Sequence, residues 1–258
     1  KKKMKINSVG LIPCRLDSQR LKNKLIKKIS GYPLFAHTYF QSINSKLDEV
    51  YVCSGDKEII DWCEKLKIKY VKTIENHSNG TERCAEAGKL LKLKDNDIII
   101  NIQGDEPLIK GNNLNLLINQ FNKNIDASVT TLHQNMASSG DLNSTKLVFS
   151  SKNKVMYISR ADIPYSRNGK NKSIHIGVFC FEFQTLKKLI KFKPSSIEKK
   201  ENIELIRCLE NDINVYSFPV QNKLIGVDTM NEFREVKSLL ERDLNYTNSI
   251  LKYYLANQ

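Results

Sequence analysis

The 258-residue sequence lacks several features that would assign a protein to a class at once. No apolar run approaches the roughly 20 residues of a membrane-spanning helix, and no signal-type apolar segment follows the basic residues 1–5. None of the six cysteines forms a Cys-x-x-Cys pair, which favours buried thiols over disulfides or zinc ligands. We therefore expect a cytoplasmic protein with no membrane insertion.

Arginine is scarce as well, with eight among the 41 basic residues, although the formal net charge is +13. The charge alone would suit nucleic acid, but no basic run of five residues and no platform of stacking aromatics accompanies it. We therefore expect no nucleic-acid partner. A planar, bidentate side chain is most useful on phosphate or carboxylate. Five of the arginines fall in segments selected below on other grounds: Arg15, Arg20, Arg83, Arg160 and Arg167.

Apolar strands alternate with helical patterns through the first half of the chain. This alternation is typical of a parallel, doubly wound α/β sheet. The second half is less regular, and no linker or repeat divides the chain. The predicted strands cover residues 8–13, 49–53, 69–71, 97–102, 127–132, 146–151, 155–159, 174–183, 214–219 and 225–228. The predicted helices cover residues 33–45, 57–67, 81–91, 112–121, 184–192, 198–211 and a long stretch from about 231.

The densest β-branched stretch, residues 97–107, ends in a group of polar residues. Its isoleucines predict a strand buried on both faces, and Gln103, Gly104, Asp105 and Glu106 follow directly. Open α/β sheets bind ligands at this end of their strands, and a carboxylate there can hold a divalent metal on a phosphate. An ordinary polar turn after a strand would look the same.

The loop after the first strand concentrates positive charge. Arg15, Arg20 and Lys24 lie within ten residues of one another. A nucleoside triphosphate carries about four negative charges, and one charge pair at about 4 Å is worth roughly 4 kcal/mol at an effective dielectric near 20. Three cations can thus help an anionic nucleophile to approach a triphosphate. A solvated basic loop is the alternative interpretation.

These motifs together resemble the 3-deoxy-manno-octulosonate (Kdo) cytidylyltransferase family, also called CMP-Kdo synthetases. The first loop follows the pattern Pro-x-Arg-x-x-Ser-x-Arg-Leu-x-x-Lys, and the likeness extends in order over nearly the whole chain. Lys22-Asn23 departs from the family's usual Pro-Gly. The further matching segments are His77 to Arg83, Asn101 to Pro107, Ser159 to Pro164, His175 to Gly177, Pro194-Ser195 and Gly226 to Thr229.

The resemblance implies a fold, a reaction and partners. The fold would be a single Rossmann-like nucleotidyltransferase domain over residues 1–258, with a mixed, mostly parallel central sheet and a small dimerisation subdomain near 136–173. The reaction would join CTP to an acidic eight-carbon ulosonic acid, releasing pyrophosphate and using Mg²⁺, for lipopolysaccharide or capsule synthesis. The family is usually homodimeric. Arg15, Arg20 and Lys24 would grip the triphosphate.

The resemblance also assigns a nucleotide-reading loop, formed by Asn79, Gly80, Thr81 and Arg83. Small and hydroxyl residues at a helix start can cap the helix and leave backbone N–H groups for a ligand, although an ordinary N-cap would need the same residues. By resemblance, this loop would read the cytosine and the ribose, with Arg83 near the nucleotide.

Asp105 and Asp228 are the predicted metal ligands. Both are expected at the ends of strands, so a parallel sheet can bring them to one edge. Two converging carboxylates repel each other unless a cation lies between them, and Mg²⁺ accepts such ligands together with substrate oxygens. In the family these two positions hold the metals. Metal there would acidify the sugar hydroxyl and neutralise the departing pyrophosphate.

The resemblance assigns the acid sugar to five further residues. Arginine can hold a carboxylate, and the others suit hydroxyl groups. A buried, satisfied histidine and a solvated glutamate on a helix are the simpler interpretations of His175 and Glu204. The five are Gln103, Arg160, Arg167, His175 and Glu204, with Lys146 as a neighbour.

Two departures in this region leave the substrate open. Phe179 and Leu205 stand where many family members have polar residues, on the side expected to face the sugar's tail. Losing hydroxyl partners changes specificity, so an 8-amino analogue that pairs with Glu204 is one alternative, and neutral drift is another. A CMP-sialate-type synthetase or a metal-dependent glycosyltransferase is a further alternative, against which the first loop argues.

Overall fold

The isoleucine-rich strand β6 (Ile98–Ile102) is buried along its whole length. It belongs to a computed structural model that describes residues 8–18, 20–74, 76–123, 126–136, 143–167 and 171–256. Ile98, Ile100 and Ile102 pack into one hydrophobic cluster, whereas Ile99 packs into a second. Because successive strand residues point to opposite faces, this division confirms that β6 is buried on both faces.

The described strands build a sheet in the order β11-β7-β10-β6-β1-β4-β5, with a β8–β9 hairpin attached through β10. The pairs β6–β1, β1–β4, β4–β5 and β11–β7 are parallel, whereas β10 is antiparallel to both of its neighbours. The predicted mixed, mostly parallel α/β sheet is thus confirmed. The other strands are β1 (Ser8–Pro13), β4 (Glu49–Ser54), β5 (Tyr70–Lys72), β7 (Val129–Met136), β8 (Lys146–Phe149), β9 (Val155–Ser159), β10 (Lys172–Glu182) and β11 (Val215–Pro219).

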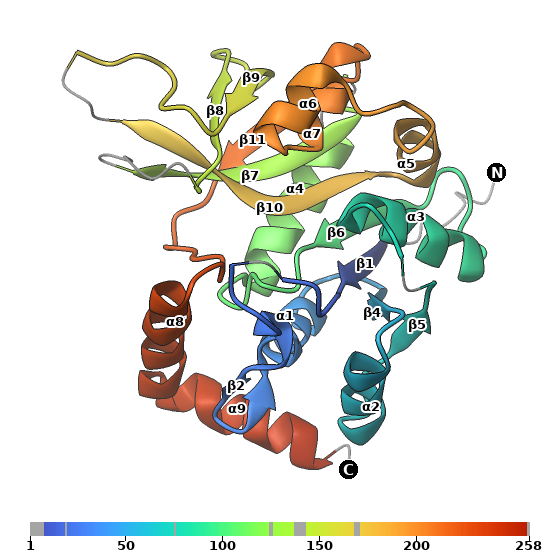
Figure 1. The fold of residues 1–258 in the computed structure, drawn as a ribbon, viewed down its shortest axis with the longest axis vertical. Coiled ribbons are helices and arrows are strands. Elements are labelled where there is room, and N and C mark those ends of the chain that lie inside the picture. Colours follow the sequence, from blue (N-terminus) through green and yellow to red (C-terminus); the bar gives the residue numbers. More distant parts are fainter. Residues whose placement is uncertain are drawn as a thin grey trace.

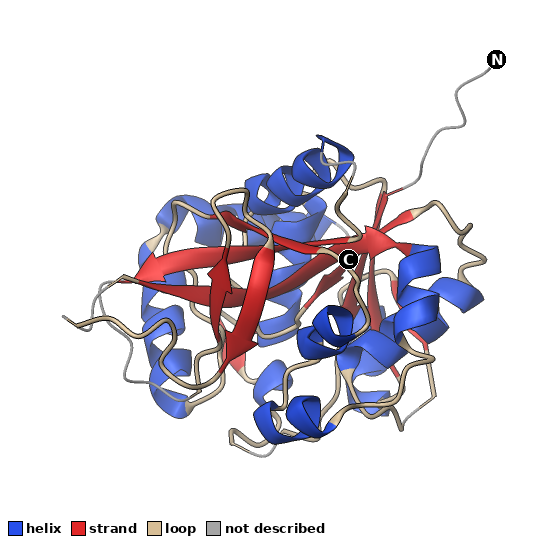
Figure 2. Cartoon of the chain, turned by 90° about the horizontal axis from the view of Figure 1, so that it is seen from above, coloured by secondary structure: helices blue, strands red, loops and turns tan. Residues whose placement is uncertain are grey.

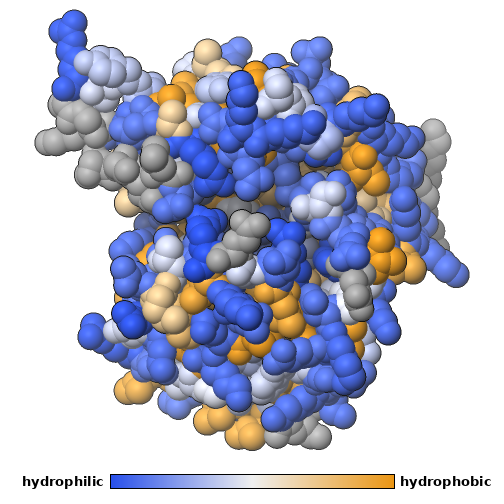
Figure 3. All heavy atoms as spheres, viewed as in Figure 1, coloured by the Kyte–Doolittle hydropathy of each residue, from blue (hydrophilic) through white to orange (hydrophobic). Residues whose placement is uncertain are grey.

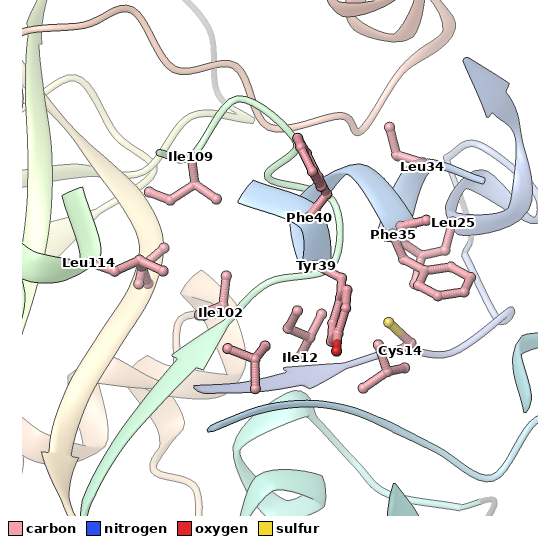
Figure 4. Packing of buried hydrophobic residues seen from close by; sticks show 14 of the residues in the cluster. Ile12, Cys14, Leu25, Leu34, Phe35, Tyr39, Phe40, Ile102, Ile109 and Leu114 are labelled. Atoms are coloured by element: carbon pink, nitrogen blue, oxygen red, sulfur yellow. The ribbon is translucent and has the colours of Figure 1, made fainter. Parts of the chain in front are cut away.

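Helices cover both faces of the sheet (Figures 1 and 2). Side chains of α1, α2, α4, α8 and α9 enter the first cluster, and those of α3, α5 and α7 enter the second. Figure 4 shows Tyr39 of α1 pointing toward Ile12 of β1, with Ile102 of β6 nearby in the same cluster. The helices are α1 (Leu34–Ile43), α2 (Lys57–Lys65), α3 (Gly80–Leu90), α4 (Gly111–Lys123), α5 (Phe183–Leu189), α6 (Ser196–Glu201), α7 (Leu205–Glu210), α8 (Met230–Arg242) and α9 (Leu244–Ala256).

Two predicted helices are each divided. The helix predicted over 198–211 ends at Asn202, whose φ of 54° lies in the left-handed region that terminates helices. The long C-terminal helix breaks at Asp243, whose ψ of 88° is not helical. A short ribbon of β2 (Lys28–Ile29) and β3 (Tyr32–Pro33), which the sequence did not predict, precedes α1.

Residues 225–228 are not a strand, contrary to the prediction for Asp228. They form a loop that leads into α8 and is tied to the loop after β6, because the Val227 N–H donates to the Asp105 carbonyl oxygen at 2.9 Å. A capping box between Thr229 and Glu232 starts α8 directly behind it. Long-range pairing, rather than a strand, therefore brings Asp228 to the sheet edge.

The predicted dimerisation subdomain near 136–173 contains the β8–β9 hairpin, which extends the main sheet through β10. Residues 137–142 and 168–170 of this segment lie outside the described residues. Its role in assembly and the single-domain boundaries remain predictions.

All six cysteines are buried and free. Among the described residues, no helix combines the length and apolar character needed to cross a bilayer.

Candidate active site

The carboxyl ends of β1 and β6 open into a cavity of about 1380 Å³. The loop after β1, the start of α3, the loop after β6, strand β10 and residues 220–228 contribute to its wall. Figure 3 shows a largely hydrophilic face of the molecule, hollowed where its upper and lower halves meet. A cavity at this edge of the sheet is where open α/β folds bind their ligands.

Asp105 and Asp228 converge on a single nitrogen atom. The ammonium Nζ of Lys24 lies 2.5 Å from Asp105 Oδ2 and 2.7 Å from Asp228 Oδ1. Burial by itself lowers the pKa of Lys24, but the two carboxylates outweigh it and hold this pKa above its ordinary value. The ammonium therefore stays charged and separates two anions that would otherwise repel each other.

The other two predicted phosphate-binding cations lie on the same wall. Arg20 Nη2 is 2.8 Å from Asp228 Oδ2, and its Nη1 donates to Asn143 Oδ1 at 3.0 Å. Arg15 is exposed and lines the cavity. All three cations predicted from the first loop thus reach the cavity, and two of them contact the predicted metal ligands.

Glu106 belongs to the polar group predicted after β6, but no individual role was predicted for it. Its side chain is 8% exposed, and its Oε1 accepts from the Gly177 N–H at 3.3 Å. Its Oε2 is buried without a hydrogen-bond partner. Burial raises the pKa of Glu106 to about 8, and the nearby Asp105 carboxylate adds to the rise. Glu106 followed Asp105 in a recognised motif, but nothing local showed that its side chain turns inward.

The carboxylates fit a magnesium ion. Mg²⁺ prefers oxygen ligands and commonly binds one or two carboxylates plus substrate oxygens. Asp105 and Asp228 already share one cation in the structure, the Lys24 ammonium. No group of three His, Cys, Asp or Glu side chains suited to a metal occurs among the described residues. Water and phosphate oxygens would therefore complete the coordination.

The predicted nucleotide loop begins α3 at the cavity. Asn79 caps the helix, its side chain accepting from the Glu82 N–H at 2.8 Å, and Asn79 and Gly80 line the cavity. Gly80 allows a close approach, because a Cβ there would lie 3.0 Å from Pro13 Cγ. The start of α3 can therefore offer backbone N–H groups to a bound nucleotide.

Thr81 and Arg83 are buried behind this loop. The Thr81 hydroxyl donates to Glu204 Oε2. Arg83 also lines the cavity, but its Nη1 donates to Thr73 Oγ1 at 2.6 Å and to the Ile74 carbonyl at 2.9 Å. Both residues thus make contacts that hold the start of α3 in place.

Gln103 and His175, which the resemblance assigns to the sugar, lie on the cavity wall. His175 Nε2 lies 2.8 Å from Thr131 Oγ1, and its ring stacks on Phe179 with centroids 5.3 Å apart. Burial lowers the pKa of His175 to about 3, so the imidazole is neutral near pH 7. It can therefore exchange hydrogen bonds with a hydroxyl group without carrying charge.

Arg160 and Glu204 line the cavity but already have protein partners. Arg160 donates from Nε to the Glu201 carbonyl at 2.8 Å and from Nη1 to the Asn143 carbonyl at 2.6 Å. Burial raises the pKa of Glu204. Arg167 is exposed and is absent from the cavity wall formed by the described residues. The structure thus gathers four of the five predicted sugar residues at the cavity.

The two substitutions noted in the sugar region differ in position. Phe179 lines the cavity beside His175. Leu205 is 4% exposed, packs into the second hydrophobic cluster and is absent from the cavity wall formed by the described residues, so the expectation that it faces the sugar is wrong. The sequence also missed an ion pair on this wall, in which Arg207 Nε donates to Glu198 Oε2 at 2.8 Å. Nine residues are about two and a half turns of the single helix predicted over 198–211, so that prediction placed the two side chains on opposite faces; the break at Asn202 lets them meet.

The chain is similar to known cytidylyltransferases. A family model described as cytidylyltransferase matches residues 9–218. A 3-deoxy-manno-octulosonate cytidylyltransferase of Lawsonia intracellularis is 35% identical, over 90% of this chain and 93% of that protein. One from Francisella tularensis subsp. holarctica is 34% identical, over 89% and 96%.

A solved structure extends the likeness to three dimensions. It is a CMP:2-keto-3-deoxy-manno-octonic acid synthetase complexed with CTP, with a TM-score of 0.84 and 27% identity, over 92% of this chain and all of that one. The sequence and the fold therefore point to the same group of nucleotidyltransferases. This chain belongs to the cytidylyltransferase family, in its 3-deoxy-manno-octulosonate cytidylyltransferase branch.

Proposed function

We propose that the protein transfers the cytidylyl group of CTP to 3-deoxy-manno-octulosonate and releases pyrophosphate. One observation carries the proposal beyond family membership: Asp105 and Asp228, more than 120 positions apart, meet at the edge of a cavity ringed by basic side chains. Both substrates are anions, and this cavity supplies cations as well as a pair of carboxylates.

In this proposal the three cations of the first loop hold the triphosphate. Arg15, Arg20 and Lys24 offset negative charge that would repel the sugar's carboxylate. Asp105 and Asp228 would hold Mg²⁺, which supplies charge neutralisation and lowers the pKa of the attacking hydroxyl. The protein's main contribution is to align the sugar hydroxyl with the α-phosphorus.

The other residues of the cavity wall would position the two substrates relative to each other. Asn79 and Gly80 would receive the cytidine at the start of α3, and Gln103 and His175 would contact sugar hydroxyls. Glu204 bonds to Thr81 and so connects the sugar side to the nucleotide side. These assignments are supported by position, because all of these residues line the same cavity.

The named relatives favour 3-deoxy-manno-octulosonate over the alternatives considered from sequence. The 8-amino alternative rested on Phe179 and Leu205 facing the sugar's tail. Because Leu205 lies in the hydrophobic core instead, half of that argument is lost.

A panel assay tests the function. Pyrophosphate release is measured with CTP, Mg²⁺ and, in turn, 3-deoxy-manno-octulosonate, its 8-amino analogue and a sialic acid. We expect turnover with the first sugar and a loss of at least 100-fold in Asp105→Asn, whose fold is checked by circular dichroism. Absence of wild-type turnover with the first sugar would refute the proposal, and near-normal turnover of Asp105→Asn would refute the metal assignment.

The wider setting is part of the same proposal. The product would serve lipopolysaccharide or capsule synthesis, and a cytoplasmic location would supply CTP and keep the six thiols reduced.

Homodimerisation through the β8–β9 hairpin is supported by the exposed side chains of Met156 and Tyr157, which are 66% and 42% accessible. Light scattering after size exclusion should give a dimer for the wild type and a monomer for Met156→Lys.

A further inference from the structure

The cation nearest to the predicted metal ligands belongs to the protein itself. Lys24 donates to both Asp105 and Asp228, and its side chain is only 12% exposed. By contrast, Arg20 is 44% exposed and contacts only Asp228 of the pair. Lys24 is therefore the group that bridges the two carboxylates, with Arg20 as an outer contact.

Lys24 has two possible sets of partners, the two carboxylates and the triphosphate, and it cannot bind both fully at once. Its ammonium is a compact charge with three donors, and the proposed function also assigns it to the triphosphate. A positive charge so close to both carboxylates opposes the entry of a second cation between them. A triphosphate offers more negative charge than the two carboxylates and can attract the ammonium away.

We infer that Lys24 is an internal counter-cation that keeps divalent metal off Asp105 and Asp228 until CTP draws its ammonium onto the phosphates. Binding of CTP would then prepare the metal site, so that metal is held productively only with the nucleotide present. This inference rests on the proposed function, because it assumes CTP as substrate and these two aspartates as metal ligands.

The local backbone suits such an exchange. Lys24 opens a three-residue 3-10 helix, and Asn23 before it has a φ of 54°. The preceding residues Lys22 and Arg20 are exposed, whereas Leu25 behind Lys24 is buried. Leu25 anchors the backbone, so the long lysine side chain can turn between neighbouring oxygens without moving the fold.

The first arm of the test measures metal binding without nucleotide. Titrations of Mn²⁺ at pH 8, followed by electron paramagnetic resonance, compare the wild type with Lys24→Met, Lys24→Arg and the matched control Lys22→Met. We expect at least tenfold tighter Mn²⁺ binding in Lys24→Met and wild-type binding in the other two. The double variant Lys24→Met/Asp105→Asn should lose this increase in Mn²⁺ affinity.

The second arm measures CTP binding with EDTA present, by calorimetry. Lys24→Met should bind CTP at least fivefold more weakly than Lys22→Met, because the lysine itself is a phosphate contact. Circular dichroism checks folding, and Lys24→Gln repeats both arms if Lys24→Met does not fold.

Unchanged Mn²⁺ affinity in Lys24→Met and Lys24→Gln, with wild-type turnover intact, overturns the exchange and leaves the proposed function standing. Unchanged CTP affinity in the second arm also overturns it. If the wild type instead fails to turn over CTP with the sugar, the proposed function falls, and the two failures are thereby distinguished.

Discussion

Arg20 and Lys24 show how solvent exposure changes what one charge contributes. Both contact Asp228, but Lys24 is largely shielded from water and Arg20 is not. An exposed ion pair is worth about 0–1 kcal/mol, so the Arg20–Asp228 contact adds little to stability. The same guanidinium on a phosphate forms charge-assisted hydrogen bonds of about 1.5–3 kcal/mol.

Arg20→Ala should therefore affect CTP use more than folding. We expect the KM for CTP to rise roughly tenfold, which corresponds to about 1.4 kcal/mol, with little change in the midpoint of urea unfolding. Steady-state kinetics with varied CTP measures the effect. Arg242→Ala, at an exposed position on α8, is the control and should stay within about twofold; equal effects would contradict the role of the loop.

Glu106 makes stability depend on pH in a direction that can be stated. Its pKa in the folded protein, about 8, lies above the ordinary value of 4.5. The folded chain therefore holds a proton that the unfolded chain releases as the pH rises from about 4.5 to about 8, and stability falls over this window.

Glu106→Gln should remove this loss. Urea unfolding with EDTA at pH 6 and pH 9 measures the free energy of unfolding of both proteins. The wild type should lose more stability between the two pH values than the variant does. Parallel losses in the two proteins would show that Glu106 ionises normally.

At the scale of elements, the irregularity in β10 shapes the cavity. Pairing of β10 with β7 shifts between Ile176 and Phe179, and bulges of this kind re-aim nearby groups at active sites. Gly177 lies in the shift, where its carbonyl accepts from the Gln103 N–H at 3.2 Å. A Cβ at Gly177 would lie 2.8 Å from Gln103 Cγ, so glycine is needed for this approach.

Gly177→Ala should consequently displace Gln103. We expect roughly 1–3 kcal/mol lower stability from overpacking and a rise in the KM for the sugar of at least fivefold, measured by thermal unfolding and by kinetics at saturating CTP. The double variant Gly177→Ala/Gln103→Ala relieves the contact, so its stability should exceed that of Gly177→Ala. Additive losses would argue against this contact.

At the scale of the whole molecule, three histidines from different elements are held uncharged: His37 and His133 are buried, and His175 is half-buried at the cavity wall. His37 of α1, His133 of β7 and His175 of β10 have their pKa values lowered by burial to about 4, 4 and 3. Their ordinary value is 6.5, so below that pH the unfolded chain binds protons that the folded chain does not. Stability should then fall with decreasing pH.

The expected loss is about 1.4 kcal/mol per pH unit for each histidine between roughly pH 6 and pH 4, less the opposing contribution of Glu106. Urea unfolding at pH 7 and pH 5 measures it. His37→Gln removes one of the three titrations and should flatten the dependence. A wild-type stability that does not change between these pH values would contradict the burial of these rings.

Local sequence was enough to predict the parts of this protein that depend on neighbouring residues. The strand Ser8–Pro13 was predicted to the residue, and β6 and the start of α3 at Asn79 nearly so. Strand periodicity and helix capping are local, and the motifs placed after those elements carried the family and the cations of the first loop.

How those parts meet became visible only in the folded chain. The antiparallel course of β10, the inward Glu106, the carbonyl partners of Arg160 and the bridge from Lys24 to Asp105 and Asp228 all join distant segments. Pairing between such segments depends on packing across the whole sheet, and a window of sequence contains only one of the two partners.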